Sequence, residues 1–368
     1  MATATENTRT SAMRESISKT ITEGVSLISP TVYVLLNGVP SPRIRIPLGD
    51  RALKHVKWAQ GGSSYDWRVK KYRSKANTST GPLRTRTFVP VDLFANPSIT
   101  MYMHDQTWGV GEGDLEANRH AGPQKIIDIK KESFTDAVSA VQTEIAYSVW
   151  NVNATNQAGG LGMLSPTSVA ASTTYGGIAM DASTTNGTDT FYYWRPQGYG
   201  YGTKTIAGNL PELIGALKRQ MTFSADSSGK GKRLVPDFAA CDETLWPYLL
   251  AYYDSKASFN IDKAANLNLL EDGKFENIVI NGITMFWDEY FGGATGYVEA
   301  AATTEFLMGT SSEFELVTTH TKAEGLIVTH TTGKTEMAWL AGQGGVAITG
   351  KQAPVFRNPR SFQVCYDT

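Results

Sequence analysis

The longest periodic pattern of apolar residues lies between residues 123 and 150. Apolar side chains recur there at spacings of mostly three and four, which places them on one face of an α-helix. Pro123 suits the first position of a helix, and no later Pro or Gly interrupts the stretch. The pattern predicts a spine helix about 40 Å long, which is long for a compact domain. The apolar face consists of Ile127, Phe134, Val138, Val141, Ile145 and Val149.

The C-terminal half combines short apolar strands with helical stretches. Residues 235–255, VPDFAACDETLWPYLLAYYDS, predict a buried strand and then a helix led by Asp242. The pair Asn281–Gly282 is a strong signal for a hairpin within 275–287. Helices and strands mix without a βαβ rhythm, so the predicted class is α+β. A further helix is expected over 209–221, and further strands at 304–309, 314–319, 325–332, 345–350 and 361–366.

The first 95 residues follow a different pattern. Residues 1–30 are rich in Ser and Thr and predict a flexible arm, whereas TVYVLL (31–36) has the composition of a strand. Residues 51–86 interleave basic and aromatic side chains, which predicts an exposed two-stranded ribbon with its turn at 77–82 and a return strand at 84–94. An isolated hairpin is only marginally stable in water, so this ribbon needs a surface on which to lie.

Charge sharpens the picture of this ribbon. Residues 43–86 carry 12 Lys or Arg but only two acids, Asp50 and Asp66. The remaining residues then hold 22 basic and 33 acidic side chains, so a block of +10 adjoins a remainder of −11. Such a block is typical of an interaction arm. Its partner is either nucleic acid or the acidic body of another copy of the same chain.

Several classes of protein are disfavoured by the remaining composition. No 18-residue apolar run is present, so we expect no membrane span, and the polar start lacks the apolar core of a secretory signal. Cys241 and Cys365 are far apart in sequence, which fits a reducing compartment better than a disulfide. The length of 368 residues is sufficient for two domains with a substantial core.

No constellation of residues predicts catalysis, a cofactor or a metal site. The glycine-rich stretch NATNQAGGLGMLSPTS lacks the Lys of a phosphate loop, so Gly160, Leu161 and Gly162 are interpreted as a stiff corner after the spine helix. Lys230 and Lys232 lie in a polar turn, which would line a central opening if the chain forms rings. The five histidines form no HExxH motif, and no calcium loop matches the acids near residue 114.

The order of these elements resembles the major capsid proteins of tailed bacteriophages. VPDFAACDETLWPYL, KFENIVINGITMFWDEYF, TEFLMGTSSEFEL and YYWRPQ resemble successive segments of that family, and the resemblance covers nearly the whole chain. It implies an α+β capsid fold with an N-terminal arm, an extended hairpin loop, a peripheral domain with the spine helix, and an axial domain. The implied bounds are 1–42 for the arm, 43–95 for the loop, 96–155 for the peripheral domain with its spine helix 123–150, 156–300 for the axial domain and 301–368 for the return strands.

The resemblance also implies a function. Members of the family self-assemble into the hexamers and pentamers of an icosahedral head that encloses double-stranded DNA. We therefore expect a structural protein of the virion, assembled in the host cytoplasm, that is not an enzyme. Because few residues precede the loop, we expect a separate scaffolding protein or an already matured chain. Further expected partners are a portal, decoration or cement proteins, and packaged DNA in non-specific contact.

Contacts between subunits are expected to use the charged arm and an acidic receiving surface. Buried aromatic side chains usually supply most of the affinity of an interface, so Trp58, Trp67 and Tyr72 are the expected anchors. Two alternatives stay open, namely a nucleic-acid-binding structural protein that uses residues 43–86 and an oligomeric enzyme with a Gly-rich domain. The remaining expected contact residues are Arg43, Arg45, Lys57, Arg68, Lys70, Lys71, Arg73, Glu112, Asp114 and Glu116.

Overall fold

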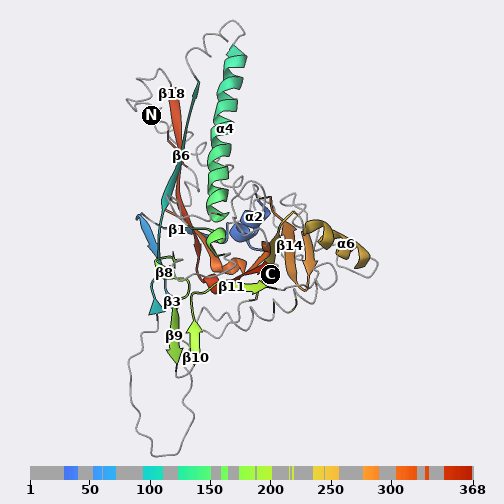
Figure 1. Ribbon diagram of the computed structural model, residues 1–368. Coiled ribbons are helices and arrows are strands. Elements are labelled where there is room, and N and C mark those ends of the chain that lie inside the picture. Colours follow the sequence, from blue (N-terminus) through green and yellow to red (C-terminus); the bar gives the residue numbers. More distant parts are fainter. Residues whose placement is uncertain are drawn as a thin grey trace, which may run out of the picture.

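The computed structural model combines one long helix with two mixed β-sheets (Figure 1), which confirms the α+β class. No helix among the described residues is both long enough and apolar enough to cross a membrane. The structure describes residues 29–39, 53–59, 61–71, 94–110, 123–150, 159–164, 174–186, 189–200, 215, 218, 235–243, 245–256, 277–289, 304–320, 328–330 and 344–366.

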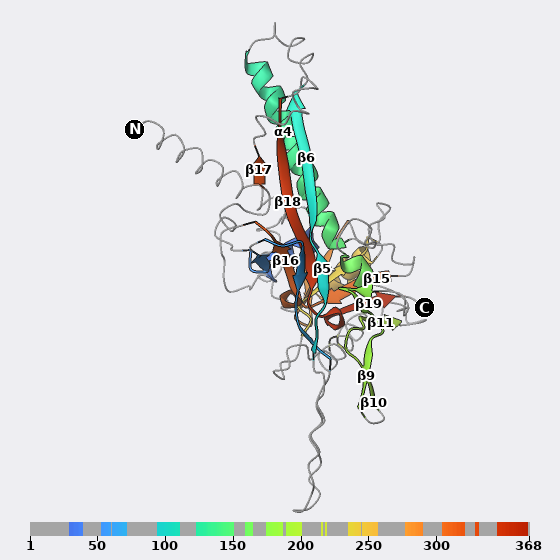
Figure 2. The same cartoon turned by 90° about the vertical axis from the view of Figure 1, so that its left-hand side faces the viewer.

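The spine helix α4 spans Pro123–Trp150, as the apolar period predicted. It packs along the strands β6 (Tyr102–Val110) and β18 (Gly344–Phe356), which run side by side in front of it in Figure 2. The two strands pair antiparallel over nine residues. Within the described part of the helix, Val141, Ile145 and Val149 are buried, so the predicted apolar face is the one that meets the sheet.

The five-stranded sheet surrounds the long strand β18. On one side β18 pairs with β6, and on the other it pairs with β16 and β17. The strand β1 adds to β16 in parallel, with Lys57 opposite Val317. The bounds of the three shorter strands are Val56–Trp58 for β1, Phe314–Thr318 for β16 and Val328–His330 for β17.

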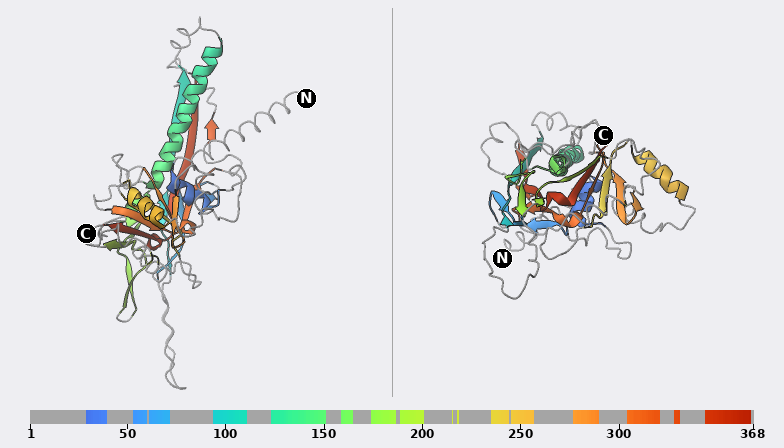
Figure 3. Two further views of the ribbon diagram at one scale, coloured as in Figure 1. Left: turned by 90° about the vertical axis from the view of Figure 1, so that its right-hand side faces the viewer. Right: turned by 60° about the horizontal axis from the view of Figure 1, so that its bottom comes forward.

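The six-stranded sheet has the order β11-β19-β15-β12-β14-β13. Asn281 (φ 53°) and Gly282 (φ 75°) form the predicted turn between β13 and β14, and positive φ at both positions suits an Asn-Gly hairpin. The helix α6 (Trp246–Lys256) lies beyond β13 and β14, at the far end of this sheet from α4 (Figure 3). The strands span Gln197–Gly200, Phe362–Tyr366, Thr304–Gly309, Phe238–Cys241, Ile283–Trp287 and Asn277–Ile280, in the order of the sheet.

Two short crossings join the sheets. The chain passes from β15 to β16 through the 3-10 turn η4 (Ser311–Glu313), and from β18 to β19 through η5 (Pro359–Ser361). Phe356 and Phe362 flank η5 and pack edge to face with ring centroids 5.1 Å apart. The crossings also mean that β15 and β19 belong to the same sheet as β12, so the predicted division at residue 300 cuts through this sheet.

The segment TVYVLL is helical, and the predicted strand at 31–36 is wrong. It forms α2 (Pro30–Asn37), in which the first seven of eight residues are buried. A helix that is apolar on all sides shows no amphipathic period, so its composition of β-branched residues suggested a strand instead. Burial between β16 and η4 outweighs this local preference.

Short strands complete the body. The pairs β2–β5, β3–β4 and β7–β8 are two-stranded, and β9–β10 forms a hairpin that projects at the end opposite α4 (Figure 1). Their bounds are Ser64–Asp66, Ser98–Thr100, Val69–Lys70, Phe94–Ala95, Thr174–Tyr175, Ile178–Ala179, Ser183–Asn186 and Asp189–Tyr192. Of the predicted helix 209–221, the structure describes only Gly215 and Lys218, both of them helical.

Candidate inter-subunit surface

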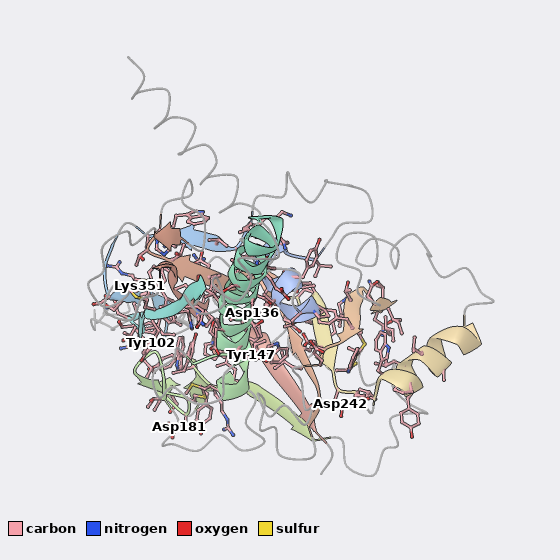
Figure 4. All side chains as sticks on the ribbon, turned by 90° about the horizontal axis from the view of Figure 1, so that it is seen from above. Tyr102, Asp136, Tyr147, Asp181, Asp242 and Lys351 are labelled. Atoms are coloured by element: carbon pink, nitrogen blue, oxygen red, sulfur yellow. The ribbon has the colours of Figure 1, made fainter. Side chains whose placement is uncertain are left out.

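An open groove of about 550 Å³ lies between the spine helix and the edge strand β6. Figure 4 looks down α4 and shows Asp136 and Tyr147 on this helix and Tyr102 on the neighbouring strand. Side chains three, four and eight positions apart on the helix share one face, which brings a stripe of polar residues to the groove. Its lining consists of Met103, His104, Gln106, Asp136, Ser139, Ala140, Val141, Thr143 and Glu144.

The groove is acidic at its surface. Asp136 and Glu144 are exposed, and the described residues that line the groove include no Lys or Arg. His104 is only 9% exposed, whereas Met103 presents 61% of its surface to solvent. Thr143 donates its hydroxyl to the carbonyl of Ser139 at 2.8 Å, which fixes one wall of the groove. Two carboxylates, hydroxyl groups and an exposed thioether fit a basic extended chain.

The two ends of the segment 72–93 are held together at the other end of the molecule. The strands β3 and β4 pair Val69 with Ala95 and Lys70 with Phe94, so the chain leaves and re-enters the body at one point. The segment itself contains Arg73, Lys75, Arg84 and Arg86 against the single acid Asp92. A basic loop of the chain therefore starts and ends at this pair of strands.

Part of the predicted extended loop, 43–95, pairs with other strands of the chain. Residues 53–71 belong to the body because β1 pairs with β16, and β2 pairs with β5 beside it. The prediction treated this stretch as one arm of a free ribbon, since alternation at period two looks the same whether a strand meets its own sheet or a neighbour.

Trp67 is an anchor of its own chain, and its role as an interface anchor stays a prediction. Its indole is 8% exposed, and Nε1 donates to the carbonyl of Arg357 at 3.0 Å. The ring stacks on Tyr65 with centroids 6.0 Å apart and tilts against Trp194 at 6.2 Å. Almost none of the side chain is left to contact another subunit.

Lys57 and Trp58 also contact their own chain. Lys57 donates to the hydroxyl of Tyr65 at 2.6 Å and lies 4.6 Å from the centre of that ring. Tyr65 in turn donates to Glu315 at 3.5 Å, and Glu315 forms an ion pair with Arg357. Trp58 is half-buried against the main core. Lys57 and Trp58 therefore contact their own subunit, and Glu315 links this region to Arg357.

The remaining predicted contact residues fall into two groups. Arg68 is exposed, and Lys70 and Lys71 are half-buried where the arm leaves the body. Arg43, Arg45, Tyr72, Arg73, Glu112, Asp114, Glu116, Lys230 and Lys232 lie outside the described residues.

The glycine-rich corner after the spine helix is buried, and so are Leu161 and Leu164. Both leucines lie in the 3-10 turn η3 (Leu161–Leu164) and are fully buried. The amide of Met163 donates to the carbonyl of Gly160 at 3.1 Å, and Gly162 is buried in the same turn. The turn packs against α4, so the corner joins the spine helix to the core.

Sequence reasoning missed a set of buried polar side chains that join the parts of the chain. Asp237 accepts two hydrogen bonds from Ser311, and Asp288 accepts two from the start of α2. Burial raises the pKa of Asp237 and lowers the pKa of His55, which lies near it. The only signal in the sequence was the position of each Asp at a strand boundary. Among the described residues, no three His, Cys, Asp or Glu side chains gather as a metal site.

Known proteins are similar to this chain in structure rather than in sequence. No protein-family model and no curated protein matches the sequence. The structure is similar to a chain of the cyanophage A-1(L) capsid asymmetric unit, with 16% identity, a TM-score of 0.56 and 93% of both chains covered. It is also similar to a chain of the cyanophage P-SCSP1u capsid, with 12% identity, a TM-score of 0.48, and coverage of 85% of this chain and 86% of the other.

The first of these likenesses extends over nearly the full length of both proteins. At 16% identity, such a likeness establishes a shared fold, and function is argued from the site. The chain has the fold of the major capsid proteins of tailed bacteriophages.

Proposed function

We propose that the chain is a major capsid protein that self-assembles into the hexamers and pentamers of an icosahedral phage head enclosing double-stranded DNA. The observation that carries this proposal is the likeness over 93% of both chains to a subunit of a cyanophage capsid. A shell subunit needs large surfaces for its neighbours and no reaction centre. The acidic groove and the basic arm are two such surfaces on one chain.

We infer that the arm of one subunit lies in the α4–β6 groove of a neighbour. The segment 72–93, folded back on itself, would extend roughly 35 Å at about 3.3 Å per residue. The spine helix is about 42 Å long, so the arm and the helix are matched in length. Arg84 and Arg86 of the arm complement Asp136 and Glu144 of the groove.

Repetition makes these weak contacts sufficient. Each exposed ion pair contributes about 0–1 kcal/mol, so a single arm in a single groove binds weakly. Every subunit of a closed shell both gives and receives an arm, and linked contacts raise the overall avidity without any new interaction. The proposal therefore predicts assembly that weakens as salt concentration rises.

Charge reversal tests the pairing. Asp136→Lys with Glu144→Lys reverses the groove, and Arg84→Glu with Arg86→Glu reverses the arm. We expect each pair alone to prevent shell formation in negative-stain electron microscopy, while circular dichroism shows an unchanged fold. Combining all four substitutions restores the complementarity and should restore shells. Shells formed by either pair alone would exclude the inferred contact.

Removal of the arm tests its role independently of charge. A chain in which residues 73–92 are replaced by a short Gly-Ser link keeps β3 and β4 and the whole of the described body. We expect this variant to fold and to remain as single subunits or small oligomers. If it still assembles into closed shells, the arm is not the element that joins neighbours.

The remaining partners are proposals that follow from the capsid function. We expect residues 156–300 to gather around the five- and six-fold axes, a separate scaffolding protein, a portal, decoration proteins and non-specific contact with packaged DNA. The protein would reside in the virion shell after assembly in the host cytoplasm. Mass spectrometry of purified particles, with and without nuclease treatment, identifies these partners directly.

A further inference from the structure

The short helix α2 is held at both ends by titratable side chains that come from distant parts of the chain. Asp288, which follows β14, meets its first turn, and His55, which precedes β1, meets its last turn. Between them, Val32 to Leu36 are almost completely buried. An eight-residue helix is too short to be stable by itself, so its contacts at the two ends decide whether it forms.

At the N-terminal end, the carboxylate of Asp288 replaces solvent as the acceptor. Its Oδ2 accepts from the hydroxyl of Ser29 at 2.5 Å and from the backbone amide of Thr31 at 3.1 Å. Asp288 is 0% exposed, and the positive end of the helix favours a negative charge at this position. Ser29 in turn accepts from the amide of Val32 at 3.4 Å.

At the C-terminal end, the imidazole of His55 satisfies a free carbonyl. Its Nδ1 lies 2.7 Å from the carbonyl oxygen of Leu35. A carbonyl can only accept, so Nδ1 carries a proton and donates it. The backbone amide of His55 donates to the carbonyl of Leu36 at 3.1 Å. The carbonyl of His55 accepts from the amide of Leu316, on β16, at 2.8 Å. His55 thus joins the end of α2 to the five-stranded sheet.

The charges around His55 come from three elements. Asp237 precedes β12, Glu315 lies on β16, and Lys54 is the preceding residue of the chain. Burial is the largest influence and lowers the pKa of His55, the Leu35 carbonyl and the two carboxylates raise it, and Lys54 lowers it. In the folded chain, the imidazole is therefore harder to protonate than in water. When α2 opens, His55 reaches water and regains its usual affinity for a proton.

We propose that α2 is a proton-controlled latch, closed while His55 is neutral and opened by acid through protonation of His55. The sign follows from linkage. The open state binds the His55 proton more tightly, so the free energy of opening falls as the pH drops below about 6.5. The free energy of opening stops falling once the pH is below the lowered pKa of His55 in the closed state.

Hydrogen exchange of the peptide that covers residues 29–38 tests the latch. The measurement uses the full-length protein between pH 5 and pH 8, with rates corrected for the intrinsic effect of pH. We expect the opening constant of α2 to rise by up to about tenfold per pH unit below pH 6.5. Corrected rates in the wild-type protein that do not change with pH would overturn the proposal.

Three variants separate a proton-controlled latch from a merely structural contact. His55→Gln keeps a donor for the Leu35 carbonyl but does not titrate, so its exchange at α2 should be independent of pH. Asp237→Asn removes a charge that favours protonated His55 in the closed state, so the fall in the free energy of opening should begin at the same pH and continue to a lower pH. His320→Gln is the matched control. The ring of His320 accepts a hydrogen bond from the amide of Lys351 at 3.3 Å, a contact that does not involve α2, so the pH dependence of exchange at α2 should be unchanged. If exchange at α2 still depends on pH in His55→Gln, the latch proposal is wrong.

Discussion

Ser311 donates two hydrogen bonds to Asp237, from its amide to Oδ1 at 2.8 Å and from its hydroxyl to Oδ2 at 2.5 Å. Asp237 precedes β12 of the six-stranded sheet, and Ser311 opens the turn that leads to β16 of the five-stranded sheet. The backbone of Asp237 contributes two more bonds, to Gly309 and from Thr284, each 3.0 Å long. This side chain therefore fixes the crossing between the two sheets.

Removal of this carboxylate should weaken the whole fold. Asp237→Ala leaves two donors of Ser311 without an acceptor, and we expect the free energy of unfolding to fall by about 1–3 kcal/mol. Asp237→Asn retains one carbonyl oxygen as an acceptor and should lose less. Urea unfolding of the purified subunit, followed by circular dichroism, measures both. Equal losses in the two variants would show that the negative charge matters more than the geometry.

The same residue predicts a dependence on pH. Burial raises the pKa of Asp237, so the folded chain binds this proton more tightly than the unfolded chain does. The contribution of Asp237 to the free energy of unfolding should therefore increase as the pH falls from above its raised pKa towards about 4. Asp237→Asn should lack this increase. The difference between the two proteins in urea midpoint, followed from pH 7 to pH 4, is the required measurement.

Trp67 should matter for folding rather than for contact between subunits. Trp67→Ala removes a buried indole, its stacking on Tyr65 and its bond to Arg357, and we expect a loss of about 3–5 kcal/mol. Arg68→Ala, on the exposed neighbour, is the matched control and should change stability by less than about 0.5 kcal/mol. Chemical denaturation measures both. A Trp67→Ala chain of normal stability that fails to assemble would restore the role first predicted for this residue.

Gly309 is required by close packing in β15. A Cβ atom at this position would lie 2.7 Å from Cδ1 of Phe362 and 2.8 Å from Cζ of Phe238. Gly309→Ala should therefore destabilise the fold by about 1–3 kcal/mol. Gly215→Ala is the control, since among the described residues its Cβ would meet Asn281 at an ordinary 3.5 Å, and a helical Ala is favoured over Gly by about 0.5–1 kcal/mol. Thermal unfolding should move in opposite directions for the two variants.

Tyr175 should make the fold sensitive to alkali. Its hydroxyl accepts the amide of Phe356 at 2.8 Å, and burial raises its pKa. Because the folded pKa lies above the unfolded value, stability is full below about pH 10 and falls as the pH rises beyond it. Tyr175→Phe should lower the free energy of unfolding by about 1–3 kcal/mol at pH 7. Between about pH 10 and pH 11, the free energy of unfolding should fall less in this variant than in the wild type. Urea unfolding across this pH range shows whether the free energies of unfolding of the wild type and of Tyr175→Phe converge.

Elements with a strong local signal were predicted well. The apolar period located α4, and the Asn281–Gly282 pair located the β13–β14 hairpin. Asp242 accepts from the amide of Leu245 at 2.9 Å, which confirms it as the residue that leads into α6. In each case, the interaction that defines the element lies within a few residues along the chain, so the sequence alone contains it.

The sequence predicted a charged contact surface, but it did not predict which residues contact their own subunit. Charge counting identified a basic arm, yet it assigned Lys57 and Trp67 to a neighbour when both contact their own subunit. The groove between α4 and β6 was not predicted, because Gln106 and Asp136 lie on different elements and nothing in the local pattern of either one indicates the other.

The sequence by itself determined the long helix, the tight turn, the strands of the C-terminal half and the imbalance of charge, since these depend on neighbouring residues or on composition. Only the tertiary structure decided that TVYVLL is a helix and that residues 53–71 join the body. It also brought Asp288 to Ser29, across 259 positions of the chain. The physical reason is that burial and long-range hydrogen bonds can exceed a local propensity of less than about 1 kcal/mol per residue. Their partners are fixed only when the chain has folded.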